Sequence, residues 1–234
     1  MLERQIEAVL NQSVDIDPSD IHVWYNKSGV DQPLPENKAI KTYVSNWNSK
    51  FFGRFAAALL CRTKYIAIID DDNLPMKNWF RSCLHTINQP ETNGILGGTG
   101  VTLLPGKSKK GHIPLSKIGW NGTHLEDVSR VDYIGQTWFF RKEWAKYIWY
   151  EEPLTWDNGE DIMFAYLAQK HGGVNTFVPP HPESDKSVWS TNPKTAWDVG
   201  RDKNASWRIR SHRNVRDELH TWCIENGWDT VNGL

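Results

Sequence analysis

The spacing of apolar residues along the chain predicts alternating helices and strands. Leu2, Ile6 and Val9 recur at helical spacing, so an amphipathic helix opens the sequence. Similar spacing predicts helices over residues 50–62, 77–87, 143–150, 160–170 and 215–226. Runs of β-branched and aromatic residues predict strands over residues 21–25, 65–69, 94–104, 131–141 and 176–178. This alternation favours an α/β fold with a largely parallel sheet.

The apolar run 65–69 leads directly into three consecutive acids, Asp70, Asp71 and Asp72. An uninterrupted apolar run is typical of a strand buried on both faces of a parallel sheet. Ligands of open α/β sheets bind beyond the carboxyl ends of the strands. Adjacent carboxylates repel one another unless a cation compensates them, and oxygen ligands suit Mg²⁺ or Mn²⁺. A surface turn before the next helix is the alternative, but the long strand favours a metal site.

A second acidic pair, Glu160 and Asp161, opens the predicted helix 160–170. Acids at a helix N-terminus also compensate the helix dipole, so ordinary capping explains this pair as well as chemistry does. The chemical interpretation is a carboxylate aimed at a reaction centre.

Composition narrows the class of protein. The chain has 234 residues, 39% of them hydrophobic and 24% charged, with a formal net charge of −1. These values fit a folded globular protein and argue against a general nucleic-acid binder. The three cysteines are too few for a disulfide framework, so we expect free thiols. No apolar run is long enough for a membrane span and the start lacks a signal-peptide pattern, so we expect a cytoplasmic protein.

Tryptophan is over-represented, with 13 residues, and ten of them lie in the second half of the chain. Extra core volume explains most of them, whereas flat rings that stack on sugars would explain one or two.

Together these segments resemble the GT-A fold of nucleotide-sugar-dependent glycosyltransferases, of the family-2 and exostosin types. Asp70–Asp72 occupies the place of the DxD motif, residues 135–141 look like the acceptor-side strand, and residues 158–161 resemble the ED motif. Residues 23–26, 53–55, 69–72 and 158–162 follow the exostosin-type segments in order.

The resemblance implies one Rossmann-like GT-A domain over residues 1–234, with a mixed, mostly parallel sheet flanked by helices. Its donor half would span about residues 1–110, its acceptor half 111–200 and a basic C-terminal segment 201–234. Domains of this kind normally begin with a strand that carries the base-binding turn. This sequence begins in the helix that follows it, so we assign no residue to the base.

The resemblance also implies roles for individual residues. Asp72 would bind the metal, and Asp70 and Asp71 would contact the donor. Arg54 would reach donor phosphate or hydroxyls. Asp161, supported by Glu160, would act as the general base of an inverting enzyme or would stabilise the reaction centre of a retaining one.

Further roles fall on the tail and on two tryptophans. Arg208 and Arg210 would stabilise the departing diphosphate. His212 would be an additional metal ligand, with His181 as the alternative. Trp138 and Trp156 would stack on the acceptor sugar.

The predicted function is metal-dependent transfer of a sugar from a nucleotide-sugar donor, expected to be a UDP-sugar, to a glycan hydroxyl. Mn²⁺ or Mg²⁺ is the expected cofactor, and the exostosin likeness tilts the expectation towards retention. Two alternatives stay open: a sugar-phosphate nucleotidyltransferase, and a non-catalytic carbohydrate-binding module. The first normally shows an early glycine-rich basic loop, which is missing here, and the second leaves both acidic motifs unexplained.

Overall fold

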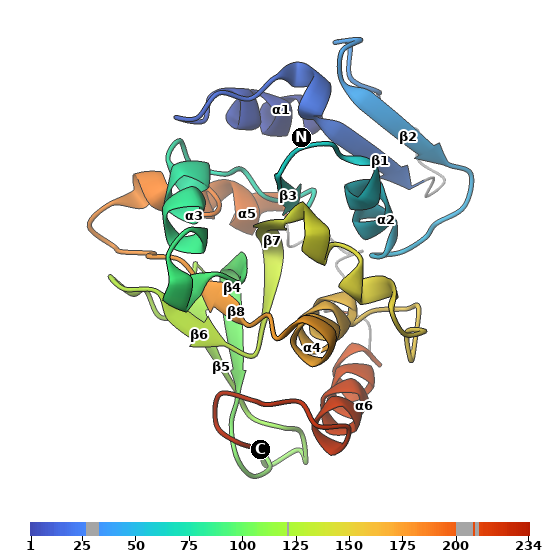
Figure 1. Cartoon of the computed structure of the whole chain (residues 1–234), viewed down its shortest axis with the longest axis vertical. Coiled ribbons are helices and arrows are strands. Elements are labelled where there is room, and N and C mark those ends of the chain that lie inside the picture. The colour runs from blue at the N-terminus through green and yellow to red at the C-terminus, as the bar shows by residue number, and fades with distance from the viewer. Residues whose placement is uncertain (27–32, 121, 200–207, 209–210) are drawn as a thin grey trace.

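The computed structural model describes residues 1–26, 33–120, 122–199, 208 and 211–234. Figure 1 shows a central sheet with helices packed around it. The helices are α1 (Leu2–Leu10), α2 (Gly53–Leu60), α3 (Trp79–Ile87), α4 (Glu160–Gly172), α5 (Pro193–Val199) and α6 (His212–Glu225). The strands are β1 (His22–Asn26), β2 (Lys41–Ser45), β3 (Tyr65–Ile69), β4 (Ile95–Leu103), β5 (Leu115–Gly119), β6 (Ser129–Val131), β7 (Tyr133–Arg141) and β8 (Thr176–Val178).

The main sheet has the strand order β3-β7-β4-β8-β6, and β5 pairs with the outer part of β4. The mixed α/β architecture is as predicted, but the expectation of mostly parallel pairing is wrong. Among the described residues of this sheet, β4 with β8 is the parallel pair, and the other pairs are antiparallel. β7 lies between β3 and β4 and runs against both. The described residues of the connection from β4 to β7 contain no helix, so the chain can return antiparallel without the crossover that a parallel strand requires.

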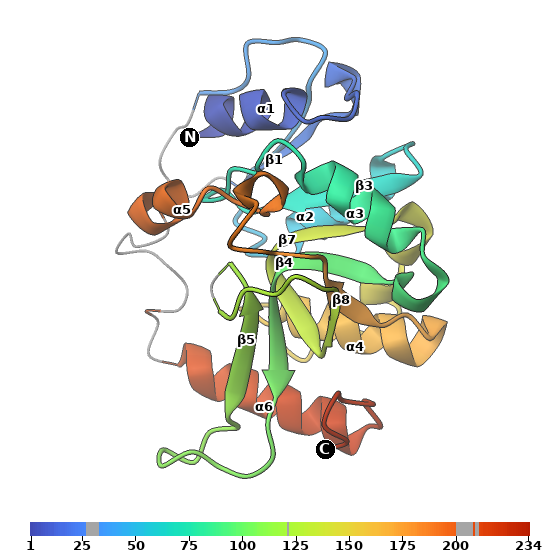
Figure 2. The same cartoon turned by 90° about the vertical axis from the view of Figure 1, so that its left-hand side faces the viewer.

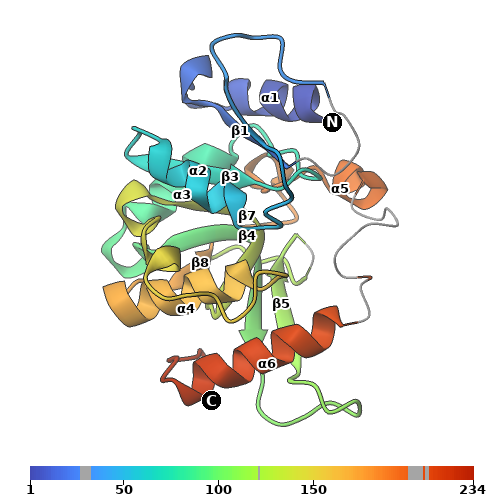
Figure 3. The same cartoon turned by 90° about the vertical axis from the view of Figure 1, so that its right-hand side faces the viewer.

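A smaller sheet stands apart from the main one. β1 pairs with β2 in parallel, from His22 opposite Lys41 to Asn26 opposite Ser45. In the described part of the chain no ladder joins this pair to the main sheet. Helix α2 packs against both β1 and β3 and so connects the two sheets. In Figure 3, α1 with this small sheet and α6 lie at opposite ends of the molecule.

Three local predictions need correction. The strand expected over residues 131–141 is interrupted at Asp132, whose carboxylate accepts hydrogen bonds from the backbone N–H groups of Leu103 and Val231. The helix expected over residues 143–150 is two short 3₁₀ turns, Lys142–Trp144 and Tyr147–Trp149. Strand β3 is not buried on both faces, because Ala67 is exposed between the buried Ile66 and Ile68.

Helix α4 is the central element of the core. Its residues from Ile162 to Ala168 are all buried, because the helix packs on β7 and is also covered by α6. Phe164 contacts Phe55 and Phe140 edge-to-face. In Figure 2, α6 crosses the lower ends of β4 and β5, and the loop between these two strands extends beyond the helix. In the described part of the chain, no helix is both long and apolar enough to cross a membrane.

Candidate active site

A cavity of about 2020 Å³ opens at the carboxyl end of β3. Its walls come from segments far apart in the sequence: the acids that follow β3, the first turn of α4, the middle of β7 and the start of α6. The cavity therefore brings together the two acidic motifs that the sequence separates by about ninety residues. Residues of β1 and β3 also line it, so the cavity reaches both sheets.

Arg54 connects the two acidic motifs. One arm of its guanidinium pairs with Asp70, and the other arm, Nη2, lies 2.6 Å from Glu160 Oε1. The guanidinium also lies 4.6 Å from the ring centroid of Trp138. Burial alone would lower the pKa of Arg54, but the surrounding carboxylates raise it. Both arms of Arg54 bind carboxylates and the residue lines the cavity, so its contact with donor phosphate or hydroxyls stays a prediction.

Trp138 belongs to the core rather than to an exposed stacking surface. Only 2% of it is exposed, with Arg54 over the ring and Phe55 against its edge. The prediction that it stacks on an acceptor sugar is therefore wrong for this conformation. Trp156 is 50% exposed and packs edge-on against Phe52, so it remains a candidate. It is not among the described residues that line the cavity, although its neighbour Asp157 is.

The three acids after β3 form a tight turn. The backbone N–H of Asp70 donates to Gln136 O at 3.0 Å, and that of Asn73 donates to Asp70 O at 3.0 Å. Burial raises the pKa of Asp70 to about 8, since Asp72, Glu160 and Asp71 oppose the influence of Arg54. Burial and Asp71 also raise the pKa of Asp72. Asp71 is exposed at the cavity wall.

These raised pKa values bear on whether a metal fits. Four carboxylates surround Arg54, namely Asp70, Glu160, Asp161 and Asp71, and Asp72 adds a fifth. Arg216 is the second guanidinium in this cluster. The carboxylates outnumber the guanidinium groups, so a divalent cation would relieve the remaining repulsion. Among the described residues, no three His, Cys, Asp or Glu side chains are already arranged as a metal site.

Glu160 and Asp161 are fixed by the way α4 begins. Gly159, with φ of 89°, precedes the helix and turns the chain into its first residue. Arg216 of α6 binds Asp161 with both guanidinium nitrogens, at 2.9 and 2.7 Å. Burial would raise the pKa of Asp161, but Arg216 outweighs burial and lowers it. Burial and the neighbouring Asp161 raise the pKa of Glu160.

Sequence reasoning missed the role of Arg216. In the sequence, Arg216 is one of six Lys and Arg residues over positions 201–216, and nothing in that run singles it out. The available signal was that α6 is a helix, because Arg213 and Arg216 are three residues apart and so share one face. Both residues line the cavity.

The predicted phosphate and metal residues of the tail have different outcomes. His212 is the first residue of α6 and lines the cavity, and burial together with Arg216 lowers its pKa. Arg208 is exposed, and Arg210 lies outside the described residues. The alternative ligand, His181, is buried against His124 and Trp189 and is not among the described residues that line the cavity.

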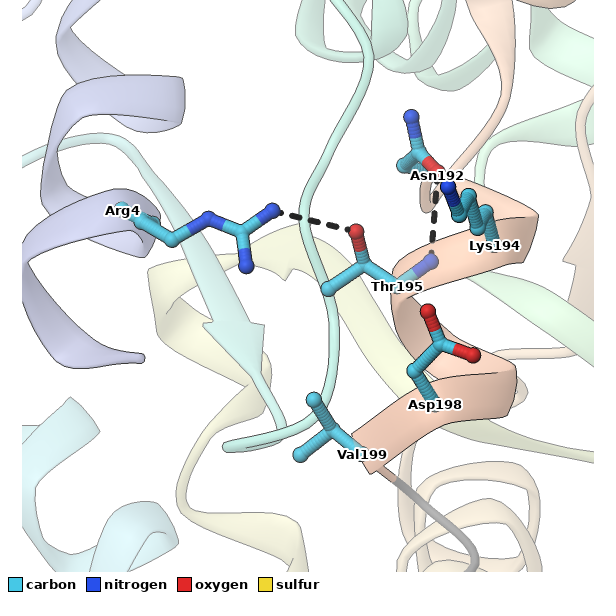
Figure 4. A pocket seen from close by; sticks show the side chains of 6 residues that line it. All are labelled: Arg4, Asn192, Lys194, Thr195, Asp198 and Val199. Atoms are coloured by element: carbon cyan, nitrogen blue, oxygen red, sulfur yellow. Dashed lines mark hydrogen bonds between the residues drawn. The ribbon is translucent and has the colours of Figure 1, made fainter.

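A second pocket, of about 390 Å³, lies between α1 and α5 (Figure 4). Arg4 Nη2 donates to Thr195 Oγ1 at 3.3 Å across it. Asp198 is the one acid in its described lining, beside Arg4 and Lys194. Because it lacks converging carboxylates, it does not compete with the larger cavity as the place for metal-assisted chemistry.

The mixed α/β fold agrees with the class of glycosyltransferases that the family comparison identifies. The family model described as Glycosyl transferase family 2 matches residues 1–149, and the chain belongs to that family. Membership supports nucleotide-sugar glycosyl transfer as the general activity.

Among solved structures, the chain is similar to one described as GalNAc-T7 with UDP, GalNAc and Mn²⁺. The two are 12% identical with a TM-score of 0.45, and the match covers 82% of this chain and 46% of that chain. This chain thus matches less than half the length of that protein. No curated protein matches the sequence.

Proposed function

We propose that this chain transfers a sugar from a UDP-sugar to a glycan hydroxyl, with Mn²⁺ or Mg²⁺ as cofactor and with retention of the anomeric configuration. The observation that carries the proposal is the bridge through Arg54, which holds Asp70 and Glu160 at one cavity. Transfer requires a group that holds the diphosphate and a group beside the anomeric carbon. The two acidic motifs supply one each.

The acids after β3 form the donor side of the proposed site. Asp72 and His212 would hold the metal, and Asp70 and Asp71 would contact the donor. The bound ion would neutralise charge that develops on the departing diphosphate. Asp72 Oδ1 accepts a hydrogen bond from Asn73 Nδ2 at 2.6 Å, which orients the carboxylate and leaves its second oxygen for a ligand.

The electrostatics of Asp161 favour retention. A general base works best with a pKa near the working pH, whereas Arg216 lowers the pKa of Asp161. A carboxylate that stays ionised suits stabilisation of positive charge at the anomeric carbon. In the proposed reaction the bond from that carbon to the diphosphate oxygen breaks and a bond to the acceptor oxygen forms. The proton of the acceptor hydroxyl passes to the departing phosphate oxygen.

The remaining residues complete the assignment. Arg208 and Arg210 would stabilise the departing diphosphate, and Trp156 would stack on the acceptor. The donor half (about 1–110), the acceptor half (about 111–200) and the basic segment (201–234) remain our proposed division of one domain.

The test is UDP binding by calorimetry, with Mn²⁺ and after chelation, for the parent and for Asp72→Asn. We expect Mn²⁺ to strengthen binding in the parent and to have little effect in the variant. UDP binding that chelation leaves unchanged in the parent would contradict the metal-dependent proposal. A donor screen with Mn²⁺, followed by NMR of the product's anomeric proton, then identifies the sugar and the stereochemistry.

A further inference from the structure

We infer that Gln136 is a sugar-recognition residue, whose side-chain amide donates hydrogen bonds to hydroxyls of the transferred sugar. This inference rests on the proposed function. The main sheet is irregular where β4 pairs with β7. Gly97 of β4 pairs with Trp138 and Thr99 pairs with Gly135, so Gln136 and Thr137 together face the single residue Gly98. Gln136 is therefore part of a β-bulge in β7.

The backbone of Gln136 is left-handed, with φ of 70°. Glycine is the usual residue in this conformation, because a side chain makes it less stable. Strained backbone of this kind concentrates at binding and catalytic sites. The bulge also lies at the donor acids, since Gln136 O accepts the N–H of Asp70 at 3.0 Å.

The amide of Gln136 has a fixed orientation. Its Oε1 accepts hydrogen bonds from Trp120 Nε1 and, at 2.9 Å, from Thr99 Oγ1. An indole nitrogen can only donate, so the amide atom that faces Trp120 must be the oxygen. The amide nitrogen then lies on the other side. Among the described residues, none forms a hydrogen bond with Nε2, although Gln136 lines the cavity. Both N–H groups are available to a ligand.

Trp120 reaches Gln136 because of the adjacent backbone. Gly119, with φ of 94°, ends β5 so close to β4 that a Cβ there would lie 2.2 Å from Gly98 O. The N–H of Trp120 donates to the same carbonyl at 3.2 Å. The turn after β5 thus holds the indole over the bulge and keeps the amide oriented.

The position of Gln136 between the two acidic motifs indicates which part of the donor its amide would contact. On one side its carbonyl is bonded to Asp70 of the donor motif. On the other side the preceding residue is Gly135, where a Cβ would lie 3.9 Å from Asp161 Oδ2. A sugar between the diphosphate and Asp161 must pass this point. Amide donors suit sugar hydroxyls, whereas the nearby carboxylates can only accept when ionised.

The test compares UDP with UDP-glucose, UDP-galactose, UDP-N-acetylglucosamine and UDP-N-acetylgalactosamine by calorimetry in Mn²⁺. Gln136→Glu keeps an acceptor for Trp120 and Thr99 but removes both free N–H donors. We expect UDP to bind this variant as it binds the parent. The advantage of the preferred UDP-sugar over UDP should fall about tenfold, the size of one or two lost hydrogen bonds.

A second variant controls for folding and charge. Gln136→Gly fits the left-handed backbone without strain and adds no charge, and it should lose the same sugar preference. Trp120→Phe frees the amide of Gln136 to rotate, so this variant should lose part of the sugar preference. An unchanged sugar preference in both Gln136 variants, with UDP still bound, overturns the role of Gln136 alone. Failure of UDP to bind the parent overturns the proposed donor class and this inference with it.

Discussion

Asp161 is the residue whose charge matters most for the proposed chemistry. We expect Asp161→Asn to reduce transfer to near background while UDP affinity changes little, because the amide keeps the shape but cannot stabilise positive charge. The measurement is transfer rate beside UDP affinity. A variant that transfers sugar at the parent rate would show that Asp161 is not at the reaction centre.

Arg216 determines the charge and orientation of Asp161. Arg216→Lys keeps a cation but loses the two-pronged contact of 2.9 and 2.7 Å. We expect kcat to fall about 10- to 100-fold, as for a misplaced catalytic group. Because Arg216 lowers the pKa of Asp161 against burial, weakening the pair should move the acidic limb of the pH–rate profile to higher pH.

Arg213→Lys is the matched control for that experiment. Arg213 also lies on α6 at the cavity, but it pairs with Asp217 and donates to Ile113 O rather than to Asp161. Its pH profile should match the parent. An identical shift in both variants would indicate a general loss of positive charge instead.

His220 makes the fold sensitive to acid. Burial and the nearby Arg216 lower its pKa to about 3, and among the described residues neither ring nitrogen has a hydrogen-bond partner. The unfolded chain takes up a proton near pH 6.5, whereas the native state takes it up near pH 3. Stability is therefore complete above about pH 6.5 and falls between these values, by up to about 1.4 kcal/mol per pH unit.

His220→Leu removes that proton from both states. We expect a shallower fall of Tm between pH 6.5 and pH 4 and an unchanged or higher Tm at pH 7, since an unpaired buried polar group is costly. His85→Gln, at an exposed position on α3, is the control and should follow the parent. A His220→Leu variant with the parent's pH dependence would contradict the assignment. His181, with a pKa of about 3 from burial, should account for part of the remaining slope.

The sequence identifies the acids of the site better than their partners. Asp70–Asp72 and Glu160–Asp161 come at predicted element ends, and pattern alone locates them. Arg54, Arg216 and Gln136 owe their roles to contacts with residues 16 or more positions away, or to a backbone irregularity. Hydrophobic periodicity contains no information on such long-range contacts or on backbone irregularities. The prediction for Trp138 failed for the same reason, because nothing local shows that Arg54 covers it.

At the scale of elements, the junction of α4 with α6 positions the carboxylate of Asp161. Gly159 has φ of 89°, and a Cβ there would lie 2.1 Å from Leu219 Cδ1. Gly173, at the other end of α4, has φ of 62° and open space around it. Gly159→Ala and Gly173→Ala therefore share the backbone strain, but only the first also requires Leu219 of α6 to shift.

We expect Gly173→Ala to cost about 1 kcal/mol and Gly159→Ala about 2 kcal/mol more, with lower transfer activity in Gly159→Ala alone. Thermal unfolding and a transfer assay measure both effects. Equal losses of Tm would mean that Leu219 moves aside freely and that α6 is not held at this point.

The sequence predicts some helices and strands and misses others. Segments with a clear apolar pattern were predicted: α1 and α3 from helical spacing, and β3 from an uninterrupted apolar run. The short strands β2 and β5 did not, because their exposed positions leave little hydrophobic pattern. Strand direction also failed, since pattern identifies a strand but not its neighbour. The insertion of β7 between β3 and β4 is a property of the assembled sheet.

At the scale of the whole molecule, the site exists only when the ends of the fold are assembled. The cavity takes residues from α1 near the start of the chain and from α6 near its end. Neither acidic motif is complete without the other, since Arg54 bridges them and Arg216 comes from a third segment. Ligands that bind this cavity should therefore stabilise the molecule as a unit.

The rise in Tm on ligand binding tests whether the cavity stabilises the whole molecule, and it also tests the metal proposal. At a UDP concentration 100 times the Kd, binding to the native state adds about 2.7 kcal/mol, which corresponds to about 5–10 °C in Tm for a chain of this size. We expect that shift with UDP and Mn²⁺ together, and much less with either alone. Asp72→Asn should abolish it, whereas Asp161→Asn should retain it, because in the proposed site Asp161 lies beside the sugar and Asp72 beside the diphosphate. A full shift in Asp72→Asn would place the diphosphate elsewhere in the cavity.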